Sequence, residues 1–100
     1  EQIKKWLDTN SIGEIRHIRW HLSKPTSEQD KSGIYNWRTD SEIATGGYFD
    51  DLASHGLDLF IHLLGNIKEV SGISHNQQGL YSSKDTVTAC WAHETGVTGT

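Results

Sequence analysis

The sequence predicts an α+β domain, an open and predominantly antiparallel sheet with helices packed on one face. One long segment carries apolar residues at helical spacing, and several others alternate apolar and polar residues with the period of a strand. These segments run in the order helix, strand, long connection, helix and consecutive strands, without the strict alternation typical of a parallel sheet. The 100 residues are enough for one small domain with a single core.

The first two predicted elements are a short helix and a strand. Ile3, Trp6 and Leu7 share one side of a helix over residues 1–9, and the polar and glycine residues of NSIG then end it. From residue 14 onward the pattern alternates, which predicts a strand with one buried face. We expect its other face to point away from the helices and to carry His17, Arg19 and His21.

A long connection over residues 23–47 precedes the main helix. It is rich in Ser, Thr, Asp and Gly, contains the only proline and shows no sustained period. Tyr35 and Trp37 beside Arg38 favour an ordered, packed segment, in which we expect Arg38 to stack on its neighbour.

The main helix is predicted over residues 49–64, closed by Gly65 where a left-handed cap is wanted. IKEVSGISHN and DTVTACWAHE then alternate as strands, and HETGVT predicts a hairpin leading into another strand. We expect His75 and His93 to be solvated strand residues. The aromatic residues expected in the core or at an interface are Trp6, Trp20 and Trp91.

Composition and charge exclude several kinds of partner. The formal charge is −4 and the nine Lys and Arg residues are scattered singly, so we expect no nucleic acid and no membrane surface as partner. No apolar run approaches the roughly 20 residues that span a bilayer. Cys90, the single cysteine, cannot form an internal disulfide, so we expect a buried, unreactive thiol and a reducing, cytoplasmic location. The chain contains no methionine and stops just after a turn signal, and we interpret it as part of a longer protein.

The main helix carries a polar stripe. Asp51, His55, Asp58 and His62 follow one another at steps of four, three and four residues, which places them on one face. The opposite face is apolar and suits docking on a sheet. A purely structural interpretation is that first-turn acids suit the helix dipole, at about 0.3–1 kcal/mol each, and that the histidines are solvated.

The functional interpretation is acid–base chemistry. A carboxylate one turn before an imidazole can hold the ring and leave its other nitrogen to take a proton from a substrate hydroxyl, which suits Asp51 and His55. We expect this pair to lie side by side at the mouth of a cleft. A zinc site of His55, Asp58 and His62 is the weaker alternative, because seven residues separate the histidines and no second cluster exists; we expect no metal. Gly46 and Gly47 suit a tight start of the helix or close approach to a ligand.

The segment YNWRTDSEIATGGYFDDLASHGLDLFIHLLGNIKEVSG resembles the Gfo/Idh/MocA family, the glucose-fructose oxidoreductase, inositol dehydrogenase and rhizopine-catabolism oxidoreductases. A Trp-Arg pair, glycines, an acid, a histidine one turn later, another Asp and a closing Leu-Gly recur there in this order. The flanking segments resemble the family's first sheet strand and later hairpin, so the resemblance covers nearly the whole chain. Thr45 replaces the first glycine of the usual triplet. The matching positions are Trp37, Arg38, Gly46, Gly47, Asp51, His55, Asp58, Leu64 and Gly65.

The resemblance implies a two-domain enzyme that transfers hydride between NAD or NADP and a sugar, polyol or related small molecule. Residues 1–100 then form a partial C-terminal domain for substrate binding and oligomerisation, without the Rossmann domain that holds the cofactor and supplies a catalytic lysine. His55 is implied as the general acid or base and Asp51 as the residue that orients substrate or that histidine. Asp58, Arg38 and Trp37 are implied near the substrate.

The same resemblance implies that the isolated chain is inactive and that the open sheet face forms a homo-oligomer. The rival hypothesis is a non-catalytic module that keeps the sheet for oligomerisation and retains the Asp-His pair as a relic. A stand-alone metal-binding domain is a third.

Overall fold

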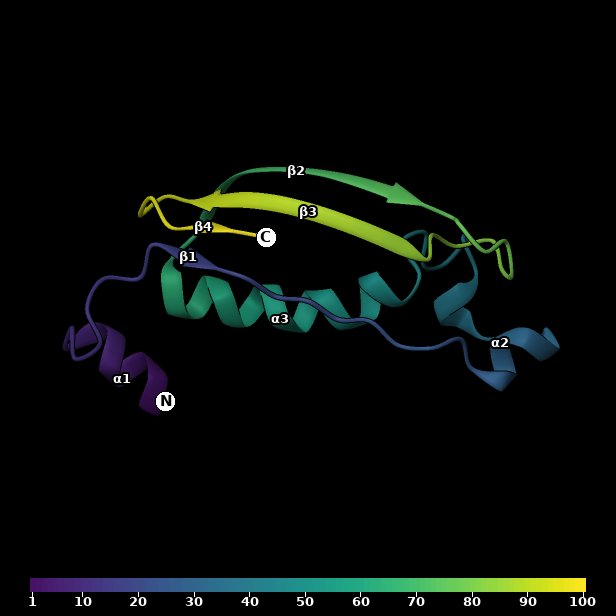
Figure 1. The fold of residues 1–100 in the computed structure, drawn as a ribbon, viewed down its shortest axis with the longest axis horizontal. Helices are drawn as coiled ribbons and strands as arrows, with labels where there is room; N and C mark the ends of the chain where they lie inside the picture. Colours follow the sequence, from purple (N-terminus) through teal and green to yellow (C-terminus); the bar gives the residue numbers. More distant parts are fainter.

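A four-stranded sheet lies over one long helix in the computed structural model, which describes residues 1–100 (Figure 1). The α+β prediction is confirmed. The helices are α1 (Gln2–Asp8), α2 (Glu28–Ser32) and α3 (Tyr48–Leu64), with a 3-10 turn, η1 (Trp37–Thr39). The strands are β1 (His17–Ile18), β2 (Ile67–His75), β3 (Thr86–His93) and β4 (Thr98–Gly99).

The sheet has the order β1-β4-β3-β2 and is mostly antiparallel, as predicted. β2 and β3 form its long pair, with His75 opposite Thr86, and β3 pairs antiparallel with β4. β1 and β4 pair in parallel. This pairing joins segments near the two ends of the chain, and no local sequence pattern predicts it. Figure 1 shows α3 beneath the sheet and no helix above it.

The predicted main helix is confirmed to within one residue as α3. Gly47 enters it with φ +64°, a left-handed value that favours glycine, and the Gly46 N–H donates to the Asp50 carboxylate at 3.0 Å. Gly65 ends it, its N–H donating to the carbonyl of Ile61. The glycine pair therefore makes the tight start of the helix.

The core lies where α3 meets the sheet. The Phe60 ring stacks on Trp91 with centroids 6.0 Å apart and meets the edge of Trp20 at 5.7 Å. A Cβ on Gly56 would overlap the Trp20 ring, so the absence of a side chain lets the indole lie on the helix. Of the tryptophans expected in the core or at an interface, Trp91 is buried, whereas Trp20 and Trp6 are 37% and 44% exposed.

The predicted strand from residue 14 is shorter than its alternation indicates. Only His17 and Ile18 are paired as a strand; the Trp20 N–H donates to the carbonyl of Thr100, and the following residues run along α3 as an extended strap, which we define as residues 20–26 (Figure 1). The reason is that β4 offers only a two-residue partner.

The connection predicted over residues 23–47 is ordered and contains α2 and η1, which the sequence analysis did not resolve. The Ser27 hydroxyl caps α2 by accepting from the N–H of Asp30, and Asn36 caps η1. Elements of five and three residues are too short to show a period, so only their caps could have marked them.

Two predictions about β3 are wrong. His93 is fully buried: the indole N–H of Trp91 donates to its Nε2 at 3.0 Å, and its Nδ1 donates to the carbonyl of Gly65 at 2.7 Å. Cys90 is exposed, because alternation places it on the sheet face opposite Trp91 and away from α3. His75 is exposed as predicted.

A carboxylate organises the turn between β2 and β3. Asp85 accepts the backbone N–H groups of Gln77 and Gln78, both at 2.9 Å, and the hydroxyl of Thr86. Burial acts to raise the pKa of Asp85, but these hydrogen bonds outweigh it and hold the pKa below its ordinary value. The ionised carboxylate therefore stabilises this turn.

Candidate functional site

The predicted polar stripe lies on the face of α3 that points away from the sheet. His55, Asp58 and His62 are exposed and Asp51 is half-buried, while Ala53, Phe60 and Leu64 are buried on the other side. The 3.6-residue period thus brings the predicted residues together on one face. At the C-terminal end of the stripe, His62 Nε2 lies 3.8 Å from the carboxylate of Glu1.

The strongest polar contact at the stripe joins Arg38 to Asp51. The Nε of Arg38 donates to Oδ2 of Asp51 at 2.8 Å, with the two side chains 38% and 25% exposed. The guanidinium also lies 4.4 Å from the centroid of the Trp37 ring, so the expected stacking of Arg38 on its neighbour is confirmed. The η1 turn thus delivers both members of the Trp-Arg pair to the start of α3.

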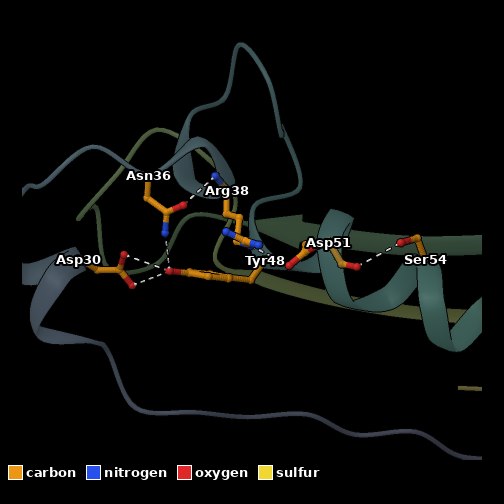
Figure 2. Close-up of polar contacts among 6 residues, drawn as sticks. All are labelled: Asp30, Asn36, Arg38, Tyr48, Asp51 and Ser54. Carbon is orange, nitrogen blue, oxygen red and sulfur yellow. Dashed lines mark hydrogen bonds and ion pairs between the residues drawn. The ribbon is translucent and has the colours of Figure 1, made fainter.

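A chain of hydrogen bonds fixes this turn against α3 (Figure 2). The side-chain Oδ1 of Asn36 accepts the backbone N–H of Arg38 at 3.1 Å, and its Nδ2 donates to the hydroxyl of Tyr48 at 3.0 Å. Tyr48 in turn donates to the carboxylate of Asp30, 3.2 Å from Oδ1. Since Asp30 is only 8% exposed, the chain ends on a buried anchor.

The electrostatics of Tyr48 reflect this environment. Burial raises the pKa of Tyr48, and the neighbouring Asp30 carboxylate raises it further, with the Arg38 charge acting in the opposite direction. The ammonium of Lys24 lies 3.6 Å from the centroid of the Tyr48 ring. The phenol therefore stays protonated and serves as a hydrogen-bond donor.

His55 is not held by Asp51 in this structure. No hydrogen bond or ion pair joins the two, because the Asp51 carboxylate is turned to Arg38, and neither ring nitrogen of His55 has a partner within the chain. Asp58 also has none. The structure thus places a fixed carboxylate and an unengaged imidazole one turn apart on the same face.

The expected cleft is not where the stripe lies. One groove, of about 550 Å³, runs between the strap, the start of α3 and the start of β3, and includes Lys24, Tyr48 and Tyr81 in its lining. A second, of about 470 Å³ and more apolar, lies between α3 and the β2–β3 pair. Neither is lined by Asp51 or His55, because both grooves open on the sheet side of the helix.

The structure gathers no three His, Cys, Asp or Glu side chains into a group that could hold a metal ion. His55, Asp58 and His62 share the helix face without converging. None of the helices combines the length and the apolar character that crossing a membrane requires.

Sequence reasoning missed Asp30, Asn36 and Tyr48. The one available signal was the short polar residue Asn36 before the Trp-Arg pair, which is typical of a helix cap. Nothing local links Asp30 to Tyr48, since eighteen residues separate them.

Comparison with known proteins agrees with this fold. The family model described as the GFO/IDH/MocA C-terminal domain matches residues 1–100, and the chain belongs to that family. A curated relative, Oxidoreductase P35 of Formosa agariphila, is 38% identical over 71 residues, which are 69% of this chain and 22% of the relative.

Two solved structures share the fold. The WlbA dehydrogenase from Bordetella pertussis, in complex with NADH and UDP-GlcNAcA, has a TM-score of 0.74 and 24% identity over 98% of this chain and 29% of that one. A levoglucosan dehydrogenase, in complex with NADH and levoglucosan, has a TM-score of 0.71 and 22% identity over 97% of this chain and 28% of that one. The chain thus spans less than a third of the length of these proteins.

Proposed function

We propose that this chain forms the substrate-side domain of an NAD(P)-dependent oxidoreductase that acts on the carbinol of a sugar, polyol or related small molecule. The observation that carries the proposal is the exposed, unengaged His55 one helical turn from the fixed carboxylate of Asp51. Membership of the oxidoreductase family supports it, as do the NADH and sugar ligands named for the two structural relatives.

The residues of this chain fit the proton-transfer side of such a reaction. An exposed imidazole with both nitrogens available can take a proton from a hydroxyl or return it. The bound nicotinamide supplies the hydride acceptor or donor, and its pyrophosphate is held by a nucleotide-binding domain outside these residues. In the oxidation direction, His55 Nε2 or Nδ1 removes the hydroxyl proton while the carbinol carbon gives up its hydride.

The neighbouring residues orient the substrate. Asp51 keeps Oδ1 free while Oδ2 is bound by Arg38, so that oxygen can accept a hydrogen bond from a substrate hydroxyl. Asp58 adds an unengaged carboxylate three residues beyond His55. The Trp37 ring, which lies against the Arg38 guanidinium, is 42% exposed. Carboxylate acceptors and an exposed aromatic ring suit a polyhydroxylated ligand.

The test is His55→Ala in the complete protein, with turnover measured on a panel of sugars and polyols. We expect kcat to fall by about 10²–10⁴-fold, the usual contribution of a positioned acid or base, and the cofactor Kd to stay nearly unchanged. His75→Ala, an exposed histidine on β2, is the matched control. Unchanged turnover in the His55 variant would remove the proposed role.

The proposal has two further consequences. Residues 1–100 are one partial C-terminal domain, so the chain alone has no turnover with either NAD or NADP. The free thiol of Cys90 supports a cytoplasmic, reducing location.

A homo-oligomer through the sheet is the second candidate function, and it would remain if the Asp-His pair were a relic. The uncovered sheet face favours it (Figure 1). Ile73 lies opposite Thr88 of β3, which alternation places on the same face as the exposed Cys90, and it is 66% exposed. Ile73→Lys should shift the sedimentation coefficient of the complete protein to that of a smaller assembly. An unchanged coefficient would exclude this face as the contact.

A further inference from the structure

We propose that Arg38 is a positioning residue that acts through Asp51, and that the Asn36–Tyr48–Asp30 chain sets its place. This inference rests on the proposed function and changes one part of it. The resemblance implied a substrate contact for Arg38, whereas the geometry points to an arginine that aims a carboxylate.

The Nε and the flat face of the Arg38 guanidinium are both engaged within the domain. Its Nε donates to Asp51 at 2.8 Å, and its flat face covers the Trp37 ring at 4.4 Å. A charge-assisted hydrogen bond from a stacked guanidinium has a defined direction, because the planar group cannot turn without leaving the ring. The half-buried Asp51 carboxylate is therefore held in one orientation.

The position of the guanidinium is set by backbone contacts. Asn36 uses both ends of its amide: the oxygen caps the N–H of Arg38, and the nitrogen donates to Tyr48 (Figure 2). Tyr48 is the first residue of α3, and Asp51 follows three residues later. Asn36 therefore ties the turn that carries the cation to the helix that carries the anion.

The Asp30 end of this hydrogen-bond chain keeps Tyr48 in place. The hydroxyl of Tyr48 donates to Asp30, a carboxylate that is almost fully buried and that receives no other side-chain donor. The raised pKa of Tyr48 keeps that donor protonated over the range in which enzymes work. Arg38 is thus placed by tertiary contacts before any substrate arrives.

With its carboxylate held by Arg38, Asp51 orients a substrate hydroxyl and not His55. Its Oδ2 is occupied by Arg38, and no bond joins it to His55, so its remaining acceptor oxygen is available to a substrate hydroxyl. Asp51 then fixes the hydroxyl while His55 removes its proton, and the two residues act on the substrate from adjacent turns. Arg38 contributes to this step through the carboxylate that it orients.

The test is a double-mutant cycle in the complete protein with Arg38→Ala, Asp51→Asn and both together, measuring kcat and KM. We expect Arg38→Ala to lower kcat by about 10- to 100-fold, because a misplacement near 1 Å costs about that much, with KM changed less than about 2-fold. The double variant should lose no more than Asp51→Asn alone, since both changes remove the same interaction. Arg16→Ala is the matched control, because the Arg16 side chain is 85% exposed and its one ion pair is with Glu14, whose side chain is 77% exposed.

Rescue separates positioning from a role in folding. Arg38→Lys keeps a cation near Asp51, and added guanidinium should restore part of the kcat of Arg38→Ala; a purely structural arginine would respond to neither. Thermal melting of each variant checks that the domain is folded. If Arg38→Ala does not fold, Arg38→Lys still tests the inference.

The results distinguish the two proposals. A raised KM with kcat unchanged would make Arg38 a substrate ligand, and additive losses would show that it does not act through Asp51; either result overturns this inference while leaving the role of His55 intact. Unchanged turnover in His55→Ala overturns the proposed function itself. Unchanged kcat in Asp51→Asn removes Asp51 from the reaction and this inference with it.

Discussion

Gly56 offers a direct test of how α3 packs. It lies inside the helix, and a Cβ at this position would overlap the outer ring atoms of Trp20 and lie 3.0 Å from Cε3. The indole cannot simply swing outward, because it packs against Phe60 and the backbone N–H of Trp20, which fixes the position of the residue, donates to the carbonyl of Thr100. Gly56→Ala therefore sets a steric cost against the better helix propensity of alanine.

The sizes of these two effects decide whether Gly56→Ala stabilises or destabilises α3. Replacing glycine by alanine inside a helix gains about 1 kcal/mol, whereas forcing an extra methyl group into a packed contact costs about 1–3 kcal/mol. We expect a net loss of about 1 kcal/mol in the free energy of opening of α3. Native-state hydrogen exchange of the α3 amides in the complete protein measures this quantity directly.

The Trp20→Ala background provides the control. Without the indole the steric cost disappears, so Gly56→Ala should there stabilise α3 by about 0.5–1 kcal/mol. A change of the same sign and size in both backgrounds would refute the contact between Trp20 and the helix as the reason for glycine.

Two other changes test the remaining buried and charged groups. His93→Ala should cost about 2–4 kcal/mol of unfolding free energy, because it leaves a cavity and removes the hydrogen-bond partner of the Trp91 indole N–H and the Gly65 carbonyl. His75→Ala should change the unfolding free energy by less than about 0.5 kcal/mol. Equal effects of the two substitutions in urea unfolding would contradict the burial of His93. The depressed pKa of Asp85 contributes stability that is present above about pH 4, the unfolded value, and is lost as the pH falls through the lower folded pKa. The melting temperature of the parent minus that of Asp85→Asn should therefore shrink as the pH falls from about 5 to about 2, and a difference independent of pH would show that the carboxylate charge is not what the turn uses.

Local patterns were enough to predict the elements that carry the site. The period of α3, its glycine boundaries and the stripe of Asp51 and His55 all follow from residues three or four positions apart, which is the range over which a helix correlates its side chains. Alternation marked β2 and β3 in the same way. The family resemblance added the chemistry to be expected on that stripe.

Contacts between distant segments decided the rest. The Arg38–Asp51 pair, the bond from Tyr48 to Asp30 and the parallel pairing of β1 with β4 join residues that share no period, so the sequence carries no sign of them. The prediction that His93 is solvated was wrong, because alternation marks a strand but does not show which polar side chain finds partners in the interior. Periodicity reports what each residue's near neighbours do, whereas burial and ion pairing depend on which elements pack together, and that is settled only when the whole chain folds.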